Sequence, residues 1–356
     1  MTVRLCVLLP LLLVAPLAAD EPKPYPPPEA VRASFKKMLD RPAVPPNPSV
    51  EEKRTDAAGR VVEELTIATE KKADGREERV PVLIVKPAKA TGKLPVVIVL
   101  HGTGGSKEGV KSWLTDLADR GIIGVAIDAR YHGARAGGAK GATAYNEAIV
   151  RAWQAKPGEP QEHPFYYDTV WDLWRLVDYL KTRDDVDGDR IGMLGISMGG
   201  IQTWLAASVD ERVKVMVPLI SVQSFRWSLD NGQWRGRANT IKAAHEAAAK
   251  DLGESEVNAK VCRALWDKVI PGMLGDYDCP SMLRLCAGRP LLILGGEEDP
   301  NCPLGGAKVA VASAEAAYKE KGASDRLKVM LVPGVKHQVT PEMRKEALDW
   351  CVKWLK

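Results

Sequence analysis

Apolar runs that alternate with amphipathic segments fill most of this chain, and this order constrains its fold more than any other feature. Short apolar runs with the character of buried strands lie at 94–100, 122–128, 190–196, 213–221, 289–296 and 326–334. Segments with helical spacing lie between or after them, at 110–121, 169–183, 199–209, 308–322 and 341–356. Strands that are apolar on both faces and alternate with helices are typical of a mostly parallel sheet covered on both sides. We therefore predict an α/β fold with a sheet of about eight strands.

Two segments before this alternation have a different texture. Residues 61–69 and 79–87 are alternately or continuously apolar and are separated by a turn sequence, which predicts a β-hairpin. Residues 20–59 are rich in proline, and we expect them to form a leader that leans on the domain.

Two further segments interrupt the alternation itself. Residues 133–167 are rich in glycine and alanine, and residues 221–288 contain several tryptophans and cysteines. Insertions of this size usually lie over one end of a sheet. We predict a single domain over residues 60–356, with a cap insertion at about 221–288.

The first nineteen residues have the layout of an export signal. Arg4 supplies a positive start, residues 5–19 carry no charge, and small residues precede Asp20. A permanent membrane anchor is the alternative, but the segment is shorter than the ~20 apolar residues that span a bilayer. We expect cleavage of residues 1–19 after Ala19 and export to the periplasm or the medium, with no membrane contact afterwards.

Composition and charge exclude several classes of protein. Apolar side chains make up 45% of the chain and charged ones 27%, which excludes a disordered or collagen-like chain. The net charge is +4 and the basic residues are interspersed, so we expect no nucleic-acid partner. We make no prediction of oligomeric state.

Five cysteines follow the signal segment: Cys262, Cys279, Cys286, Cys302 and Cys351. Because five is odd, at least one remains unpaired within the chain. An oxidising compartment would permit one or two disulfide bonds among the first four, and the sequence leaves their pairing open. Cys351 lies on an apolar helical stripe and is expected to be a packed thiol. Close pairs such as Cys-x-x-Cys are absent, so we predict no metal site.

The strongest local motif is Gly-Ile-Ser-Met-Gly-Gly at 195–200, between an apolar strand and a helix. A serine on so sharp a turn adopts a strained conformation, and only small residues two positions away leave room for it. The turn would raise the Ser197 hydroxyl above the sheet edge. Ser197 is therefore our candidate nucleophile.

A serine hydroxyl needs a base, and five histidines could supply one. His337 is our candidate, because it follows the last strand on a loop that leads into a helix. The others end or follow earlier strands, or fall in the insertions: His101, His132, His163 and His245.

The third member of such a triad is a carboxylate that orients the histidine. Glu297, Glu298 and Asp299 directly follow a buried strand. We choose Asp299, because two prolines stiffen the loop around it, and keep Glu298 as second choice. The order serine, aspartate, histidine is the one expected when each residue follows a later strand of such a sheet.

Two backbone N–H groups would stabilise the oxyanion formed when a carbonyl is attacked. Met198 directly follows the serine and supplies one donor. The turn His-Gly-Thr-Gly-Gly at 101–105 can present the second, and Thr103 is our choice. A glycine-rich loop that only reverses the chain is the alternative. Neither phosphate-binding glycine motif has the required spacing here.

These motifs together resemble the α/β-hydrolase family from about residue 60 to the end. The resemblance rests on the motifs HGTGG, GISMGG, GGEEDPNCP and PGVKH. The run from Tyr167 to Gly200 is similar to the branch with dienelactone hydrolases, acetyl xylan esterases and prolyl-oligopeptidase-like enzymes. Methionine follows the nucleophile where some acetyl xylan esterases carry glutamine, and dienelactone hydrolases have a cysteine nucleophile. The resemblance implies Ser197, Asp299 and His337 as triad.

We therefore expect an exported serine esterase that works through an acyl-enzyme and requires no metal or cofactor. Acetyl or other esters of carbohydrates are candidate substrates, and Trp234, Arg235 and Arg237 in the cap are candidate contacts to a sugar ring or an acidic group. A prolyl-oligopeptidase-like peptidase is the first alternative, although a propeller domain normally precedes such enzymes. A non-catalytic binding protein on the same fold is the second.

Overall fold

The structure is a computed structural model that describes residues 25–72, 74–89 and 91–356. The expected signal segment, residues 1–19, and the start of the leader lie outside the described residues. No helix in the described part of the chain has both the length and the apolar character needed to cross a membrane.

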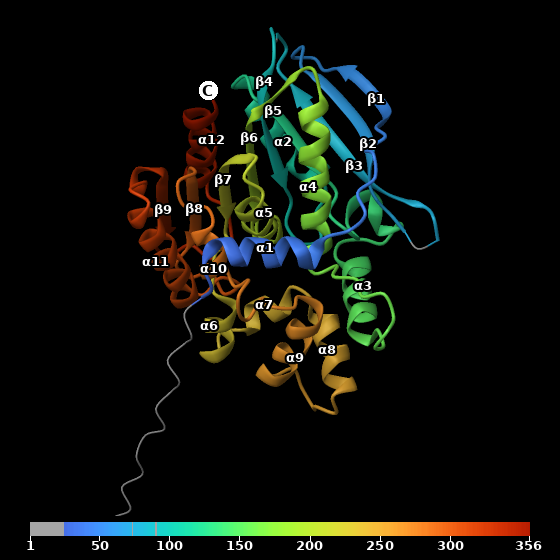
Figure 1. The fold of residues 1–356 in the computed structure, drawn as a ribbon, viewed down its shortest axis with the longest axis vertical. Helices are drawn as coiled ribbons and strands as arrows, with labels where there is room; N and C mark the ends of the chain where they lie inside the picture. The colour runs from blue at the N-terminus through green and yellow to red at the C-terminus, as the bar shows by residue number, and fades with distance from the viewer. Residues whose placement is uncertain (1–24, 73, 90) are drawn as a thin grey trace, which may run out of the picture.

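Nine strands of the described chain form one sheet, in the order β1-β2-β3-β5-β4-β6-β7-β8-β9 (Figure 1). Their bounds are β1 Ser49–Thr55, β2 Val61–Lys71, β3 Glu77–Lys86, β4 Leu94–Leu100, β5 Ile123–Ile127, β6 Val186–Ile196, β7 Val213–Leu219, β8 Leu291–Gly296 and β9 Leu327–Val332. The pairs β1–β2, β2–β3 and β3–β5 are antiparallel. The remaining neighbours, from β5–β4 to β8–β9, pair in parallel. This confirms the predicted α/β class.

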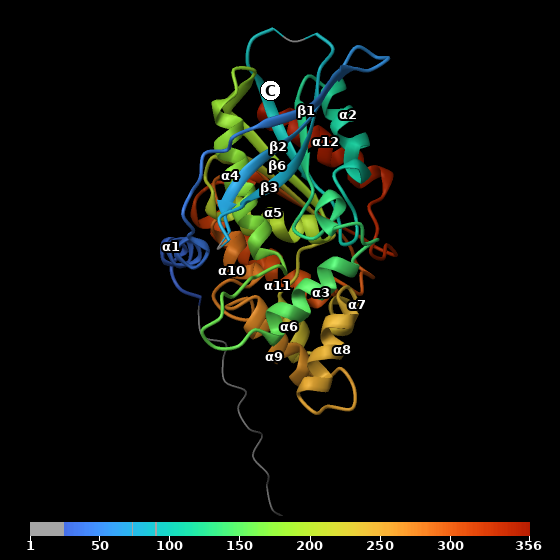
Figure 2. The same cartoon turned by 90° about the vertical axis from the view of Figure 1, so that its right-hand side faces the viewer.

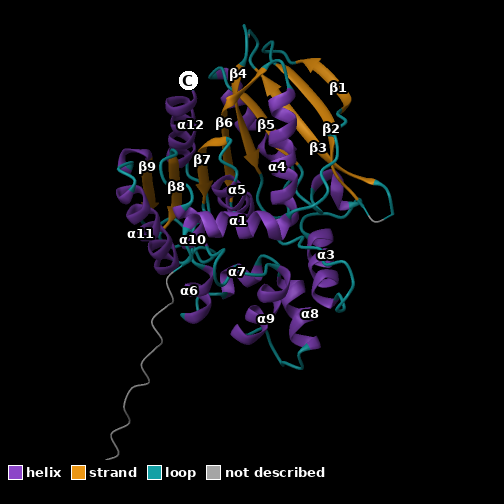
Figure 3. Cartoon of the chain, in the orientation of Figure 1, coloured by secondary structure: helices purple, strands orange, loops and turns teal. Residues whose placement is uncertain are grey.

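Helices cover both faces of the sheet, so it has a core on each side (Figures 2 and 3). On one face lie α1 Pro28–Leu39, α4 Tyr167–Thr182, α5 Met198–Val209, α10 Cys279–Arg284 and α11 Leu304–Glu320. On the other lie α2 Lys111–Asp119 and α12 Pro341–Leu355. Every residue of α5 is buried. An apolar helix enclosed on all sides is a rigid support for the turn that precedes it.

The two interrupting segments are helical and lie beyond the ends of the parallel strands (Figures 1 and 3). Residues 133–167 contain α3 Thr143–Gln154. Residues 221–288 contain α10 and four further helices, namely α6 Phe225–Asp230, α7 Arg235–Asn239, α8 Lys242–Asp251 and α9 Ala259–Val269. We call α6 to α9 the cap helices. Of these, α8 and α9 pack against α3, and α6 packs against α11.

The leader differs from the prediction in one respect. Its residues 49–55 form β1, the edge strand of the sheet, so the sheet has nine strands where about eight were predicted. The segment has no apolar alternation, and almost all of its side chains are exposed. Backbone pairing and the ion pairs Lys53–Glu63 and Arg54–Glu64 attach it to β2, and neither leaves a hydrophobic pattern in the sequence.

Candidate active site

Ser197 lies on a sharp turn between β6 and α5. Its backbone has φ 55° and ψ −112°, in a region that residues other than glycine rarely adopt. Two glycines make the turn sterically possible. A Cβ atom on Gly195 would lie 2.1 Å from the carbonyl oxygen of Gly199, and one on Gly199 would lie 2.5 Å from that of Leu100. The glycines predicted around the serine are therefore required by close backbone contacts.

His337 contacts both other members of the predicted triad. Its Nε2 lies 2.8 Å from Ser197 Oγ, and its Nδ1 lies 2.7 Å from Asp299 Oδ2. Because a carboxylate only accepts, Nδ1–H donates to Asp299 and Nε2 accepts from the serine hydroxyl. The structure thus brings together three residues that lie far apart in the sequence.

The acid loop, residues 297–302, holds Asp299 in place by backbone contacts. Asp299 Oδ1 accepts hydrogen bonds from the N–H groups of Asn301 at 2.8 Å and Cys302 at 3.1 Å. The Glu298 side chain, the second choice for the acid, is exposed, whereas the Asp299 side chain is completely buried. Of the two, the structure places Asp299 against the histidine.

Backbone hydrogen bonds also join the acid loop to the end of β9 and to the histidine loop, residues 333–340. The N–H groups of Glu297 and Glu298 donate to the carbonyl oxygens of Val332 and Val335, each at 3.0 Å. A Cβ on Gly296 would lie 2.1 Å from the Val335 carbonyl oxygen, so this close approach requires glycine. The two loops are therefore held at a fixed separation.

Both predicted oxyanion donors lie on segments next to Ser197. Met198 is the first residue of α5, where a backbone N–H has no acceptor within the helix. A Cβ on Gly102 would lie 3.7 Å from the Ser197 Cβ, so the glycine turn passes directly beside the serine. Thr103 is the next residue and lies inside a turn closed by a 3.0 Å hydrogen bond from Gly105 N–H to the Gly102 carbonyl.

Comparison with known proteins identifies the family. The family model described as acetyl xylan esterase (AXE1) matches residues 36–231, more than half of the chain. The chain belongs to the acetyl xylan esterase (AXE1) family. It is therefore a carboxylic ester hydrolase.

Individual relatives agree with this family. The chain is 28% identical over 291 residues to a putative hydrolase, YtaP, of Bacillus subtilis (strain 168), a match that covers 78% of the chain and 84% of the relative. Acetyl xylan esterase 1 of Thermoanaerobacterium sp. JW/SL YS485 has a TM-score of 0.67 at 19% identity, covering 94% of this chain and 96% of that one. A glucuronoyl esterase of Solibacter usitatus has a TM-score of 0.63 at 17% identity, covering 91% and 92%. These structures show that the fold is the predicted α/β-hydrolase fold.

In this AXE1-family esterase, hydrogen bonds made by His101 join the glycine turn to the segment that follows β5. Its Nδ1–H donates to the Gly102 carbonyl at 2.8 Å, and its Nε2 accepts from the Ala129 N–H at 3.2 Å. Burial lowers the pKa of His101, which keeps the ring neutral and in this tautomer at pH 7. The sequence placed His101 at a strand end, but its partner after β5 could be found only in the fold.

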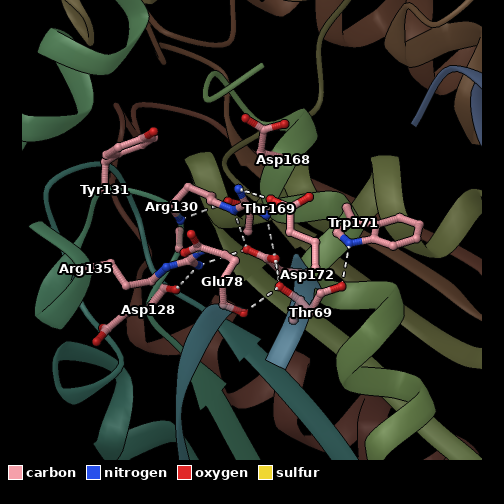
Figure 4. A network of polar contacts seen from close by, with 12 residues as sticks. Thr69, Glu78, Asp128, Arg130, Tyr131, Arg135, Asp168, Thr169, Trp171 and Asp172 are labelled. Atoms are coloured by element: carbon pink, nitrogen blue, oxygen red, sulfur yellow. Dashed lines mark hydrogen bonds and ion pairs between the residues drawn. The ribbon is translucent and has the colours of Figure 1, made fainter. Parts of the chain in front are cut away.

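A buried ion network supports the loop after β5 (Figure 4). Asp172 on α4 is completely buried and pairs at 2.9 Å with both Arg130 and Arg135 of this loop. Arg130 also pairs with Glu70 at 2.8 Å, and Arg135 with Glu78 at 2.5 Å. Each buried charge thus has a partner, as buried ions require. The network fixes the loop that carries His132, and the sequence analysis did not single it out.

His132 is buried and gives the esterase a predicted sensitivity to acid. Burial lowers its pKa to about 4, and the neighbouring His101 adds to this effect. An unfolded histidine binds a proton below about pH 6.5, so the unfolded state gains protons first as the pH falls, and stability is lost. Between pH 7 and pH 5, we expect the unfolding free energy to fall by about 2 kcal/mol more in the wild type than in His132→Asn. Urea unfolding at both pH values measures this difference, and equal losses would contradict it.

The three predicted substrate contacts occupy different environments. Trp234 is buried, and the Cζ atom of the exposed Arg235 lies 4.9 Å from the centroid of its ring. Arg237 is buried, and its Nη2 donates to the carbonyl oxygen of Asn301 at 3.0 Å, next to Asp299. Of the three residues, Arg237 thus contacts the acid loop directly.

The cysteines form no disulfide bond among the described residues. All five that were considered are buried and free. Cys302 is the last residue of the acid loop, and its thiol donates to the Ile220 carbonyl oxygen at 3.3 Å. Donor atoms of Asp299, Cys302 and His337 lie within 4.8 Å of one another, a spacing that a metal ion could use. These atoms are already engaged in the hydrogen bonds described above, so we treat the group as part of the hydrogen-bonded site.

Proposed function

We propose that this protein is an exported serine esterase with Ser197 as nucleophile, His337 as general base and Asp299 as the acid that orients it. The observation that carries the proposal is the pair of contacts from His337, 2.8 Å to Ser197 Oγ and 2.7 Å to Asp299 Oδ2. A nucleophile within hydrogen-bond reach of a base, which a third group orients, is the arrangement that activates a serine hydroxyl.

The reaction follows from this arrangement. His337 Nε2 takes the hydroxyl proton while Ser197 Oγ attacks the ester carbonyl, and the N–H groups of Met198 and Thr103 stabilise the oxyanion. The intermediate collapses, the alcohol leaves with the proton from His337, and the acyl group remains on Ser197. Water then attacks the acyl-enzyme by the same route and releases the acid. Neither step calls for a metal or cofactor.

Esters of carbohydrates are the substrates we propose. The family is described as acetyl xylan esterases, and the structural neighbours include an acetyl xylan esterase and a glucuronoyl esterase. The matched region ends at residue 231, directly after α6, so the family model does not extend over the later cap helices. Acetyl groups on a sugar chain are the first substrates to test.

A labelling experiment and a substrate panel test this proposal together. A fluorophosphonate should label the protein once, with the adduct mapped to Ser197 by peptide mass spectrometry. The unlabelled protein should release acid from acetylated xylan, feruloyl esters or aryl esters faster than it cleaves proline-containing peptide amides. An adduct on another residue would contradict the triad, and preference for the peptides would favour the peptidase alternative.

Export is proposed from the layout of residues 1–19. Expression of the full chain with a functional secretion system should give a periplasmic or secreted protein whose N-terminus is Asp20. An uncleaved chain that stays in the cytoplasm would contradict this prediction.

A further inference from the structure

Arg237 on α7 is a buried cation that forms no ion pair with an acidic residue in the described part of the chain. Only 1% of the residue is exposed, and no ion pair within 4.0 Å joins it to an Asp or Glu among the described residues. Its Nη2 contacts two uncharged groups, the Asn301 carbonyl at 3.0 Å and the Cys302 thiol at 3.4 Å. Its Nε–H is buried without any hydrogen-bond partner. A buried charge without a counter-ion costs several kcal/mol, so its retention calls for an explanation.

Asp299 is near enough for its charge to raise the pKa of Arg237, but no ion pair or hydrogen bond joins the two side chains. It lies on the same loop as Asn301 and Cys302, but His337 occupies one of its oxygens and two backbone N–H groups occupy the other. The helix that carries Arg237 lies directly on this loop, since a Cβ on Gly236 would be 1.9 Å from the Pro300 carbonyl oxygen. Arg237 is thus held beside the triad with donor capacity unused.

Two tyrosines near Arg237 also have hydroxyls that could bind a ligand. Burial raises the pKa of Tyr166 to about 12, and both the charge of Arg237 and a hydrogen bond from Arg237 to the Tyr166 hydroxyl oxygen oppose this rise. Burial likewise raises the pKa of Tyr145, whose hydroxyl is buried and has no hydrogen-bond partner among the described residues. Both hydroxyls therefore keep their protons at neutral pH, so each O–H can donate to a ligand. Tyr166 has φ 76°, a strained backbone that brings it into this position.

Side-chain contacts connect this cluster to Ser197 from two directions. On one side, the ring centroids of Tyr145 and His132 are 4.5 Å apart, and those of His132 and His101 are 5.2 Å apart. His101 directly precedes Gly102, the glycine beside Ser197. On the other, Cys302 joins Arg237 to the group formed with Asp299 and His337. Two series of contacting residues thus link the Arg237 cluster to the surroundings of Ser197.

We infer that Arg237 binds a carboxylate group carried by the ester substrate, with the Tyr145 and Tyr166 hydroxyls as additional donors. The preferred substrates are then esters with a free carboxylate on the acyl part, as in monoesters of dicarboxylic acids, or on the alcohol part, as in acylated acidic sugars. This inference rests on the proposed function, because it places the charged group relative to the attack by Ser197. A carboxylate would supply the directly paired counter-ion that Arg237 lacks among the described residues.

Matched pairs of substrates test the inference. The acyl pair is mono-p-nitrophenyl succinate and p-nitrophenyl butyrate, and the alcohol pair is 4-acetoxybenzoate and 4-acetoxybenzamide. The wild type should prefer the anionic member of at least one pair. In Arg237→Gln, kcat/KM for that member should fall about ten- to hundred-fold, the range of a lost charge-assisted hydrogen bond, with little change for the neutral member. Arg237→Lys should keep part of the preference.

A control variant and a binding measurement separate the outcomes. Arg263→Gln removes an exposed cation from α9 of the cap and should leave both members of each pair unchanged. Equal losses on both members in Arg237→Gln would overturn the inference and assign Arg237 to holding the acid loop. If that variant does not fold, competitive inhibition of the wild type by succinate but not succinamide is the expected result, and equal inhibition overturns it. The proposed function fails separately, if no ester of either kind is hydrolysed through Ser197.

Discussion

Replacing Ser197 with alanine is expected to lower kcat for p-nitrophenyl acetate by roughly 10⁴- to 10⁶-fold. The variant keeps both oxyanion donors and the pair formed by His337 and Asp299, but it has no oxygen to form the acyl-enzyme. The fold should persist, because alanine fits the same turn and the Ser197 N–H bond to the Leu219 carbonyl is a backbone contact. Steady-state hydrolysis together with thermal unfolding measures both effects.

Ser324→Ala is the matched control for this variant. Ser324 is exposed and lies in the short segment before β9, on a different part of the chain. It should retain full hydrolysis and full labelling by the fluorophosphonate, whereas Ser197→Ala should lose both. Hydrolysis that persists in a folded Ser197→Ala protein would show that another group carries the reaction.

Asp299→Asn is expected to lower kcat by roughly 10⁴-fold. An asparagine can turn its amide N–H₂ toward His337 Nδ1, which would favour the tautomer with the proton on Nε2. That tautomer cannot accept the Ser197 proton. The substitution changes little volume, so the binding of substrate should be affected far less than the chemical step. The measurement is kcat and KM for the same aryl ester at neutral pH.

Glu298→Gln gives the comparison for the acid position. The Glu298 side chain is exposed, and its contact to the histidine loop is made by the backbone N–H, which the substitution retains. We expect a change in kcat of less than about three-fold, because a lone surface charge contributes little. A larger loss in Glu298→Gln than in Asp299→Asn would move the acid role to Glu298.

The strands that could be predicted from the sequence are those that bury apolar side chains. The run at 94–100 coincides with β4, because its residues are almost entirely buried. The edge strand β1 was missed, since its SVEEKRT sequence faces solvent and joins β2 through backbone pairing and ion pairs such as Arg54–Glu64, without apolar burial. Hydrophobic periodicity reports burial, and it carries no information about a strand that has none.

The candidate site divides in the same way. Ser197, Asp299 and His337 could be proposed because each follows a strand and two have glycine or proline neighbours that restrict the backbone. The surroundings of Arg237 could not be predicted, because arginines in an insertion are usually exposed and this one is buried. Its neighbours Tyr145 and Tyr166 come from the other inserted segment, 133–167, and only the fold brings the two insertions together.

The backbone hydrogen bonds between the acid loop and the histidine loop affect how the sequence of this esterase can change during evolution. Main-chain hydrogen bonds form whatever side chain a residue carries, so most positions of the two loops can change identity while Asp299 and His337 keep their separation. Two glycines are exceptions: a Cβ on Gly296, at the end of β8, would collide with the Val335 carbonyl, and Gly334 in the histidine loop has a φ of 72° that other residues rarely adopt. Side chains on these loops can therefore be replaced while the contacts among Asp299, His337 and Ser197 stay the same. Selection for another substrate need not alter those contacts.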